Sequence, residues 1–91
     1  MKVKYFATYR DFTRCKEENI PAQADIRALL SSISERYGAA FRDKLFTTDG
    51  TDVGEETIIL VNGRNIHHLN GIDTTLTETD AVSIFPMVAG G

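Results

Sequence analysis

Residues 58–63 read Ile-Ile-Leu-Val-Asn-Gly, an apolar run followed at once by a turn dipeptide. Four residues of this kind in a row predict a β-strand. Asn-Gly is a strong hairpin signal, because both central positions of the tight turn need a positive φ. We therefore expect a hairpin whose returning strand covers 64–69, with a further turn at 70–71. The last strand is expected over 81–85, and Pro86 should end it.

The first twenty residues predict two more strands. Residues 2–8 alternate as a strand does, with Phe6 as an apolar residue on the otherwise polar side. The polar stretch 10–16 is expected to be a loop. A short second strand then covers 17–20 and is closed by Pro21.

The middle of the chain predicts one clear helix, from Asp25 to Tyr37. Its apolar residues fall within an arc of about 100° at helical spacing. Asp25 is suited to cap the start of the helix and Gly38 to stop it. Residues 41–46 could form one short helical turn, and the polar stretch 47–56, with two glycines, predicts a flexible loop.

The resulting order is β-β-α-β-β-β, with the helix as the long crossover. This order favours an α+β fold, a mixed sheet of four to five strands with one main helix packed across one face. The first two strands should be antiparallel neighbours. This is the order of the ubiquitin-like β-grasp, so we expect a single such domain over 1–91, with 86–91 as a flexible C-terminal tail.

Composition limits the classes of function. The 91 residues carry a net charge of −3 without a basic cluster, which disfavours nucleic-acid binding. No apolar run approaches the roughly 18 residues of a membrane span, and the N-terminus resembles a strand rather than a secretory signal. The single cysteine, Cys15, cannot form an internal disulfide, so a cytoplasmic location is expected.

The chain ends in Gly90-Gly91, and this ending predicts chemistry at the terminal carboxylate. Glycine has no Cβ, so two glycines can pass through a narrow channel and present a carboxylate to another enzyme. Fully extended, 86–91 would reach roughly 20 Å from the domain. Gly91 is therefore the candidate reactive residue.

Three motifs in the final third resemble those of one family, the MoaD/ThiS sulfur-carrier proteins. They are Val-Asn-Gly at 61–63, Thr-x-Leu-x-x-x-Asp at 74–80 and Phe-Pro-x-Val-Ala-Gly-Gly at 85–91. Residues 3–7 and 26–37 also resemble the family, less specifically. Length and the Phe-Pro pair are closer to the small subunit of molybdopterin synthase than to the thiamine-pathway carrier.

The chain departs from the family pattern at three places. Pro86-Met87 stands where the family usually has Pro-Pro, and Glu78-Thr79-Asp80 where it usually has Asp-Gly-Asp. The 47–56 loop is long for the bacterial type. These departures concern the pathway more than the carrier chemistry.

The resemblance implies a protein co-substrate rather than an enzyme. An E1-like, MoeB/ThiF-like enzyme would use ATP and Mg²⁺, which the carrier itself does not bind, to adenylate Gly91. A sulfur donor would then leave a thiocarboxylate, whose sulfur goes to a pterin precursor in a MoaE-like large subunit for molybdenum cofactor biosynthesis. The alternatives are a Urm1-like or SAMP-like carrier for protein conjugation or tRNA thiolation, and a ThiS-like carrier for thiamine biosynthesis.

Docking to such partners requires an apolar surface. Strand alternation places Phe6, Leu60 and Phe85 away from the helix side, where they would cluster if the first and last strands are neighbours. The alternative is an edge of the core covered by loops. The candidate binding residues are Phe6, Leu60 and Phe85 on the sheet and Pro86, Met87, Val88, Ala89 and Gly90 in the tail.

Other reactive residues predict no further chemistry. His67 and His68 are adjacent on an expected strand and would point to opposite faces, so a shared metal is disfavoured. Cys15 has no activating base beside it in sequence. The acidic loop at 49–56 lacks the calcium-loop pattern, and Asp80 is expected to be a turn residue.

Overall fold

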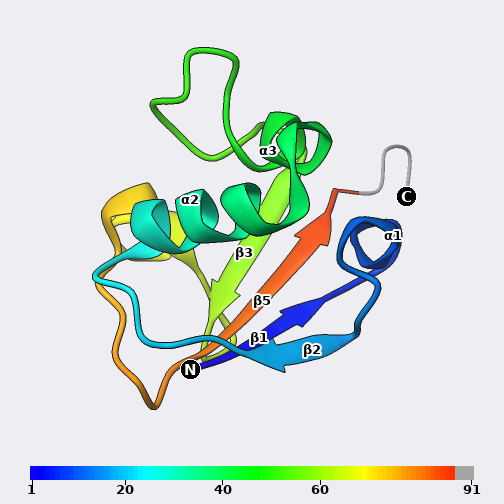
Figure 1. The fold of residues 1–91 in the computed structure, drawn as a ribbon. Helices are drawn as coiled ribbons and strands as arrows, with labels where there is room; N and C mark the ends of the chain where they lie inside the picture. Colours follow the sequence, from blue (N-terminus) through cyan, green and yellow to red (C-terminus); the bar gives the residue numbers. More distant parts are fainter. Residues whose placement is uncertain (88–91) are drawn as a thin grey trace.

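A five-stranded mixed sheet with helices on one side forms the protein, in a computed structural model that describes residues 1–87 (Figure 1). The elements are β1 (Lys2–Tyr5), α1 (Tyr9–Thr13), β2 (Glu17–Asn19), α2 (Ile26–Tyr37), α3 (Ala39–Leu45), β3 (Thr57–Val61), β4 (Arg64–Asn65), the 3₁₀ helices η1 (Ile66–His68) and η2 (Gly71–Asp73), and β5 (Ala81–Pro86). The strand order is β2-β1-β5-β3-β4. The pair β1–β5 is parallel and the other pairs are antiparallel, which confirms the predicted mixed α+β sheet.

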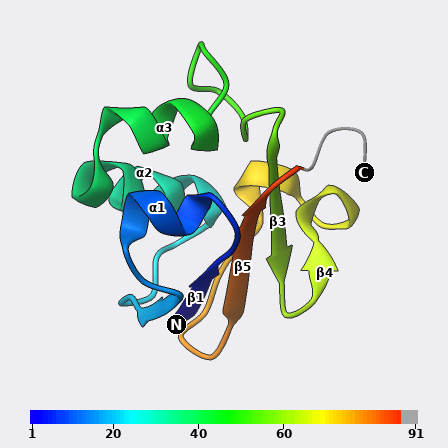
Figure 2. The same cartoon turned by 90° about the vertical axis from the view of Figure 1, so that its right-hand side faces the viewer.

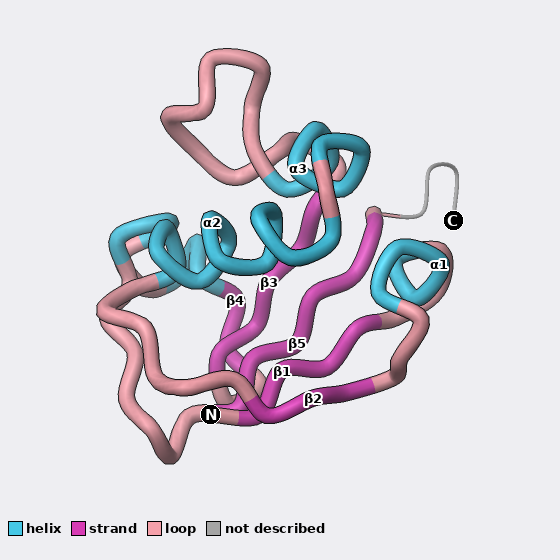
Figure 3. The backbone as a smooth tube through the Cα atoms, viewed as in Figure 1, coloured by secondary structure: helices cyan, strands magenta, loops and turns pink. Residues whose placement is uncertain are grey.

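Helix α2 crosses the inner face of the sheet, as its periodicity predicts (Figure 3). The Asp25 carboxylate accepts a hydrogen bond from the Ala28 N–H at 2.9 Å and so caps the helix start. Gly38 has a φ of 102°, a conformation that favours glycine, and α2 ends there. The buried residues of α2 are Ile26, Leu29, Leu30, Ile33 and Ser34.

Aromatic rings occupy one end of the core, around Phe41 of α3. Phe41 is fully buried, and the Phe12 ring stacks on it with centroids 4.8 Å apart. Tyr5, Tyr9 and Tyr37 meet the same ring edge-on, at 5.2 to 6.5 Å. These contacts join α1, α2 and α3 to β1.

The predicted loop at 10–16 is wrong in part, because helix α1 occupies Tyr9–Thr13. The predicted strand over 2–8 ends at Tyr5, and Ala7 adopts a positive φ of 51° that turns the chain into α1. Tyr9 is 2% exposed against Phe41, so burial of aromatic side chains stabilises a helix that has little local signal.

The predicted strand over 64–69 is also wrong in part, since β4 includes only its first two residues. The chain then enters η1, where the Asn65 side chain accepts a hydrogen bond from the His67 N–H at 2.9 Å. This local capping bond competes with strand pairing. The hairpin before it is confirmed, with φ values of 52° at Asn62 and 84° at Gly63.

The sequence predicts that Pro86 ends the last strand, and this prediction is wrong. Pro86 belongs to β5 and pairs with Thr57. The pairing of β5 with β1 stops at Ile84, so Pro86 lies beyond the end of β1 and its missing N–H costs no ladder bond on that side. On the other side the Met87 N–H donates to the Glu56 carbonyl at 2.6 Å. Sheet pairing with β3 therefore extends to Met87.

No helix within residues 1–87 has both the length and the apolar character needed to cross a membrane.

Candidate functional site

The candidate site has two described parts, the outer face of the sheet and the end of β5. Figure 2 shows the α-helices on one side of the sheet, which leaves the other face without a covering α-helix. The predicted site residues Val88, Ala89, Gly90 and Gly91, and the prediction of a flexible tail, lie outside the described residues.

Phe6, Phe85 and Leu60 share the outer face, together with Ile58. We call these four residues the outer patch. The Phe6 and Phe85 rings meet edge-on with centroids 5.5 Å apart. Ile58 lies directly opposite Phe85 in the β3–β5 register, and Leu60 opposite Ser83. All four residues are half-buried, so the patch is less exposed than we expected.

One cause of that burial is Arg10, whose guanidinium carbon lies 5.5 Å from the centre of the Phe6 ring. Such a cation–π contact covers one ring face while leaving the charge near solvent. Ile58 is absent from the predicted site residues, although it follows from the same alternation that selects Leu60 two positions later.

Met87 marks the point where the described chain leaves the sheet, which we call the tail root. The residue is 54% exposed, the highest exposure of any large hydrophobic residue in the described part of the chain. A groove of about 440 Å³ lies toward α1, and its lining includes Phe12, Lys44 and Met87. A second, of about 480 Å³, lies toward η1 and the 47–56 loop.

One buried and one part-buried hydrogen bond fix the backbone beneath the tail root. The Thr57 hydroxyl donates to the Lys44 carbonyl at 2.5 Å, and the Tyr9 hydroxyl lies 2.7 Å from the same Thr57 oxygen. Thr57 has a single hydroxyl proton, so Tyr9 must be the donor in the second bond. Burial raises the pKa of Tyr9, which keeps this proton in place. The start of β3 is thereby tied to both α1 and α3.

The 47–56 loop is held to the body at its ends. Gly54 is buried, and its N–H donates to the Leu45 carbonyl at 2.8 Å. A Cβ at Gly54 would lie 2.3 Å from the Lys44 carbonyl oxygen, so the close approach of the two backbones requires glycine here. The loop thus returns to β3 next to the tail root.

At the opposite end of β5 the Asn62 side chain connects two turns. It donates to the Asp80 carboxylate at 2.8 Å and accepts from the Ala81 N–H at 2.9 Å. The hydrogen bond from Asn62, followed by that from the Thr77 N–H, lowers the pKa of Asp80. Asp80 is therefore a turn-forming carboxylate, as expected from the sequence.

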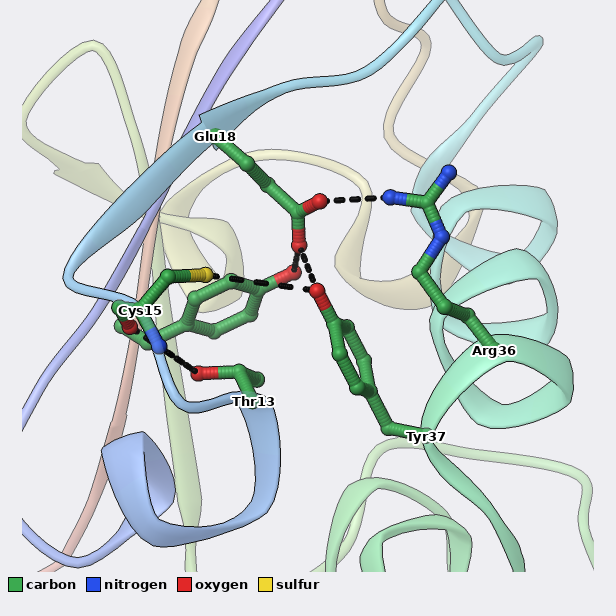
Figure 4. A network of polar contacts seen from close by, with 6 residues as sticks. Thr13, Cys15, Glu18, Arg36 and Tyr37 are labelled. Atoms are coloured by element: carbon green, nitrogen blue, oxygen red, sulfur yellow. Dashed lines mark hydrogen bonds and ion pairs between the residues drawn. The ribbon is translucent and has the colours of Figure 1, made fainter.

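Glu18 of β2 accepts hydrogen bonds from two tyrosines, of which Figure 4 labels Tyr37. The Tyr37 and Tyr5 hydroxyls donate to it at 2.6 and 2.8 Å, and Arg36 pairs with its other oxygen at 2.5 Å. Burial, followed by the hydrogen bond to Glu18, raises the pKa of both tyrosines. Cys15 lies at the border of this cluster, its sulfur 4.0 Å from the Tyr37 hydroxyl.

The histidines and the acidic loop are placed differently from what the sequence predicts. His67 and His68 lie on η1 and not on a strand, so the alternation argument does not apply to them. Within residues 1–87, three or more metal-ligating side chains do not gather at any point. Asp49 accepts bonds from the hydroxyls of Thr47 and Thr51, which lower its pKa and stabilise the loop.

A mixed sheet that packs against one main helix and whose other face has no covering α-helix defines a ubiquitin-like β-grasp protein. The sequence model of the ThiS family matches residues 3–91, and the chain belongs to this family of ubiquitin-like sulfur carriers. The predicted resemblance is confirmed, and proteins of this kind are carriers or modifiers rather than enzymes.

Individual relatives agree over the whole length. Small archaeal modifier protein 3 of Haloferax volcanii is 36% identical over 94 residues, covering 100% of this chain and 98% of the relative. The solution structure of small archaeal modifier protein 1 from Methanosarcina acetivorans superposes with a TM-score of 0.84 at 30% identity, covering 99% and 94% of the two chains. A Pyrococcus furiosus protein proposed as subunit 1 of a molybdopterin converting factor has a TM-score of 0.69 at 34% identity, covering 96% and 95%.

Proposed function

We propose that the Gly91 carboxylate is adenylated by an E1-like enzyme and that the activated carbonyl is then transferred, as a thiocarboxylate or onto a lysine. The main observation that supports this proposal is that the ThiS family match extends to Gly91. In the described fold, Met87 directly follows β5, the central strand of the sheet. The length of the tail beyond the sheet suits a reactive end that enters a partner's active site.

The chemistry follows from leaving groups. A Gly91 carboxylate oxygen would attack the α-phosphorus of ATP and release pyrophosphate, giving an acyl-adenylate. Hydrosulfide, HS⁻, would attack the acyl carbon and displace AMP, leaving a thiocarboxylate and releasing a proton. A lysine amine attacking the activated carbonyl would instead form an isopeptide bond and release a proton. The chain supplies only the carboxylate, so its fold contributes presentation and docking.

Similarity to the relatives favours protein modification as the use of the activated Gly91 carbonyl. Two full-length similarities, at 36% and 30% identity, are to small archaeal modifier proteins. Sulfur donation for molybdopterin is the second candidate, supported by the 34% identity to the Pyrococcus furiosus protein and by the Phe-Pro-x-Val-Ala-Gly-Gly ending. Both candidates need the same activation step, and in the second the partner would be a MoaE-like large subunit.

The activation step is tested by ATP–pyrophosphate exchange with the purified E1-like enzyme of the same organism. Deleting Gly91, or adding one residue after it, should abolish exchange while thermal melts stay unchanged. Glu78→Ala, an exposed loop change at the other end of β5, is the control and should retain full exchange. Full activity of the deletion would disprove the proposal.

The two fates are separated by intact mass of the protein isolated from its own cells. A carrier for sulfur transfer would show replacement of one terminal oxygen by sulfur. A modifier would be found joined through Gly91 to lysines of other proteins. Either result identifies the acceptor class.

Docking to the activating enzyme is proposed to use the outer patch. The four side chains lie on the face that the α-helices leave uncovered, and aromatic residues at such centres often contribute about 2 kcal/mol or more to binding. Phe85→Ala should therefore weaken binding by roughly thirtyfold. Calorimetric titration measures this, and thermal melts exclude unfolding as the cause. Unchanged affinity in a folded variant would remove Phe85 from the interface.

A further inference from the structure

The groove between Met87, the 47–56 loop and η1 has an apolar floor and an acidic rim. Its apolar lining includes Val53, Ile58 and Met87, and its titratable lining consists of the two carboxylates of Asp52 and Glu55 and the imidazole of His67. The volume of about 480 Å³ is enough for one or two side chains of a partner, and too open to be a closed ligand pocket.

The acidic character extends along the sequence around the groove. Residues 45–63 contain four carboxylates, at Asp49, Asp52, Glu55 and Glu56, and no basic residue, while Lys44 and Arg64 flank this range directly. Some of these charges have local partners, since Glu56 lies 3.9 Å from the Lys44 ammonium and Asp52 accepts the Val53 N–H at 2.7 Å. Glu55 is exposed and makes no side-chain hydrogen bond or ion pair within residues 1–87.

The apolar floor is held in position by the backbone. The Met87 N–H bond to the Glu56 carbonyl fixes the tail root next to the loop that carries the acidic rim. Ile58 belongs both to the floor and to the outer patch, where it lies opposite Phe85. The groove is thus continuous with the outer patch and lies against Met87, the last residue that the structure describes.

We propose that this groove is a second docking site for the E1-like partner and that it receives a segment with an apolar side chain flanked by lysine or arginine. The proposal rests on the function proposed above. An apolar side chain would cover Val53, Ile58 and Met87, while the basic group would meet Glu55 at the rim. Charge complementarity of this kind favours the correct partner and accelerates its association. The groove would distinguish partners before the tail reaches their active site.

The test compares Glu55→Lys with Glu78→Lys in ATP–pyrophosphate exchange, with the carrier as the varied substrate. Both variants change the net charge equally, and Glu78 is exposed at the far end of β5. Glu55→Lys should raise KM about tenfold at low salt with kcat unchanged, and the effect should shrink as salt screens the charges. Glu78→Lys should leave both constants near those of the wild type.

A second variant tests the apolar floor. Met87→Ser keeps the backbone N–H, so the bond to Glu56 remains, and it should raise KM severalfold at every salt concentration. Thermal melts confirm that each variant is folded, and Glu55→Gln replaces Glu55→Lys if the latter is not.

Three results overturn the proposal. The first is equal KM for Glu55→Lys and Glu78→Lys. The second is an effect confined to kcat. The third is concentration-dependent self-association of the wild type that Glu55→Lys abolishes, since the groove would then bind a second copy of the chain. If the wild type shows no exchange, the proposed function fails and this inference fails with it. If the wild type is active and the groove variants match the control, only the inference fails.

Discussion

Thr57→Val removes one hydroxyl beneath the tail root and should destabilise the domain by about 2–4 kcal/mol. Valine has nearly the same shape, so the substitution leaves no cavity. It deprives two groups of their partner, the Tyr9 hydroxyl and the Lys44 carbonyl, in a region where Tyr9 is 2% exposed and Thr57 6%. Each buried polar group without a partner costs about 1–3 kcal/mol.

The effect is measured by urea and thermal unfolding of the wild type, the two single variants and the pair Tyr9→Phe/Thr57→Val. A loss of 2 kcal/mol corresponds to a fall in Tm of roughly 8–16 °C for a domain of this size. The pair should be more stable than Thr57→Val alone by about 1 kcal/mol or more, because one of the two unpartnered groups is gone. The assignment of Tyr9 as donor to Thr57, and of Thr57 as donor to the Lys44 carbonyl, is refuted by either of two results. One is a loss of less than about 0.5 kcal/mol in Thr57→Val. The other is a further loss of stability when Tyr9→Phe is added.

Three further outcomes are expected. Gly54→Ala should cost about 1–3 kcal/mol in urea unfolding, because its methyl would lie 2.3 Å from a carbonyl oxygen of α3; a neutral result would show that the loop can shift. Asn62→Gly should retain the turn and lose the side-chain hydrogen bonds to the Asp80 carboxylate and from the Ala81 N–H, whereas Asn62→Ala should be less stable than Asn62→Gly because φ is 52° at this position. The pKa of Tyr5 is raised in the folded protein relative to about 10 in the unfolded chain. The contribution of Tyr5 to the free energy of unfolding is therefore fully present below about pH 10 and is lost as the pH rises further, because there only the unfolded chain has lost the proton. Urea melts between about pH 8 and 11 should show a shallower alkaline decline in Tyr5→Phe, and an equal decline in both proteins would contradict this assignment.

The parts of the fold that the sequence predicts correctly are those with local causes. The Asp25 cap, the helical periodicity of α2 and the positive φ values at Asn62-Gly63 are properties of a few neighbouring residues. Helix α1 was not predicted because contacts with distant residues stabilise it. The early end of β4 was not predicted because the Asn65 side chain caps η1. Tyr9 is buried against Phe41, more than thirty positions along the chain.

In the candidate site, too, only the part with a local cause could be predicted from the sequence. Alternation along single strands was enough to select Phe6, Leu60 and Phe85 for the outer face, because period-two patterns depend only on strand geometry. The groove could not be foreseen, since it forms where the 47–56 loop meets Met87. That meeting depends on a Glu56–Met87 backbone bond between residues about thirty positions apart.

The position of β5 between β1 and β3 has a consequence for how the protein is made. The strand synthesised last among the five lies at the centre of the sheet, and its register joins the first strand to the third. During translation the β1–β2 and β3–β4 hairpins would emerge without the strand that unites them, and non-local pairing of this kind is slow to form. A ribosome that stalls before Ala81 releases a chain with two separate hairpins and an open core. Completion of the sheet therefore requires the chain as far as β5, so the fold that holds the tail root can form only after that strand has been made.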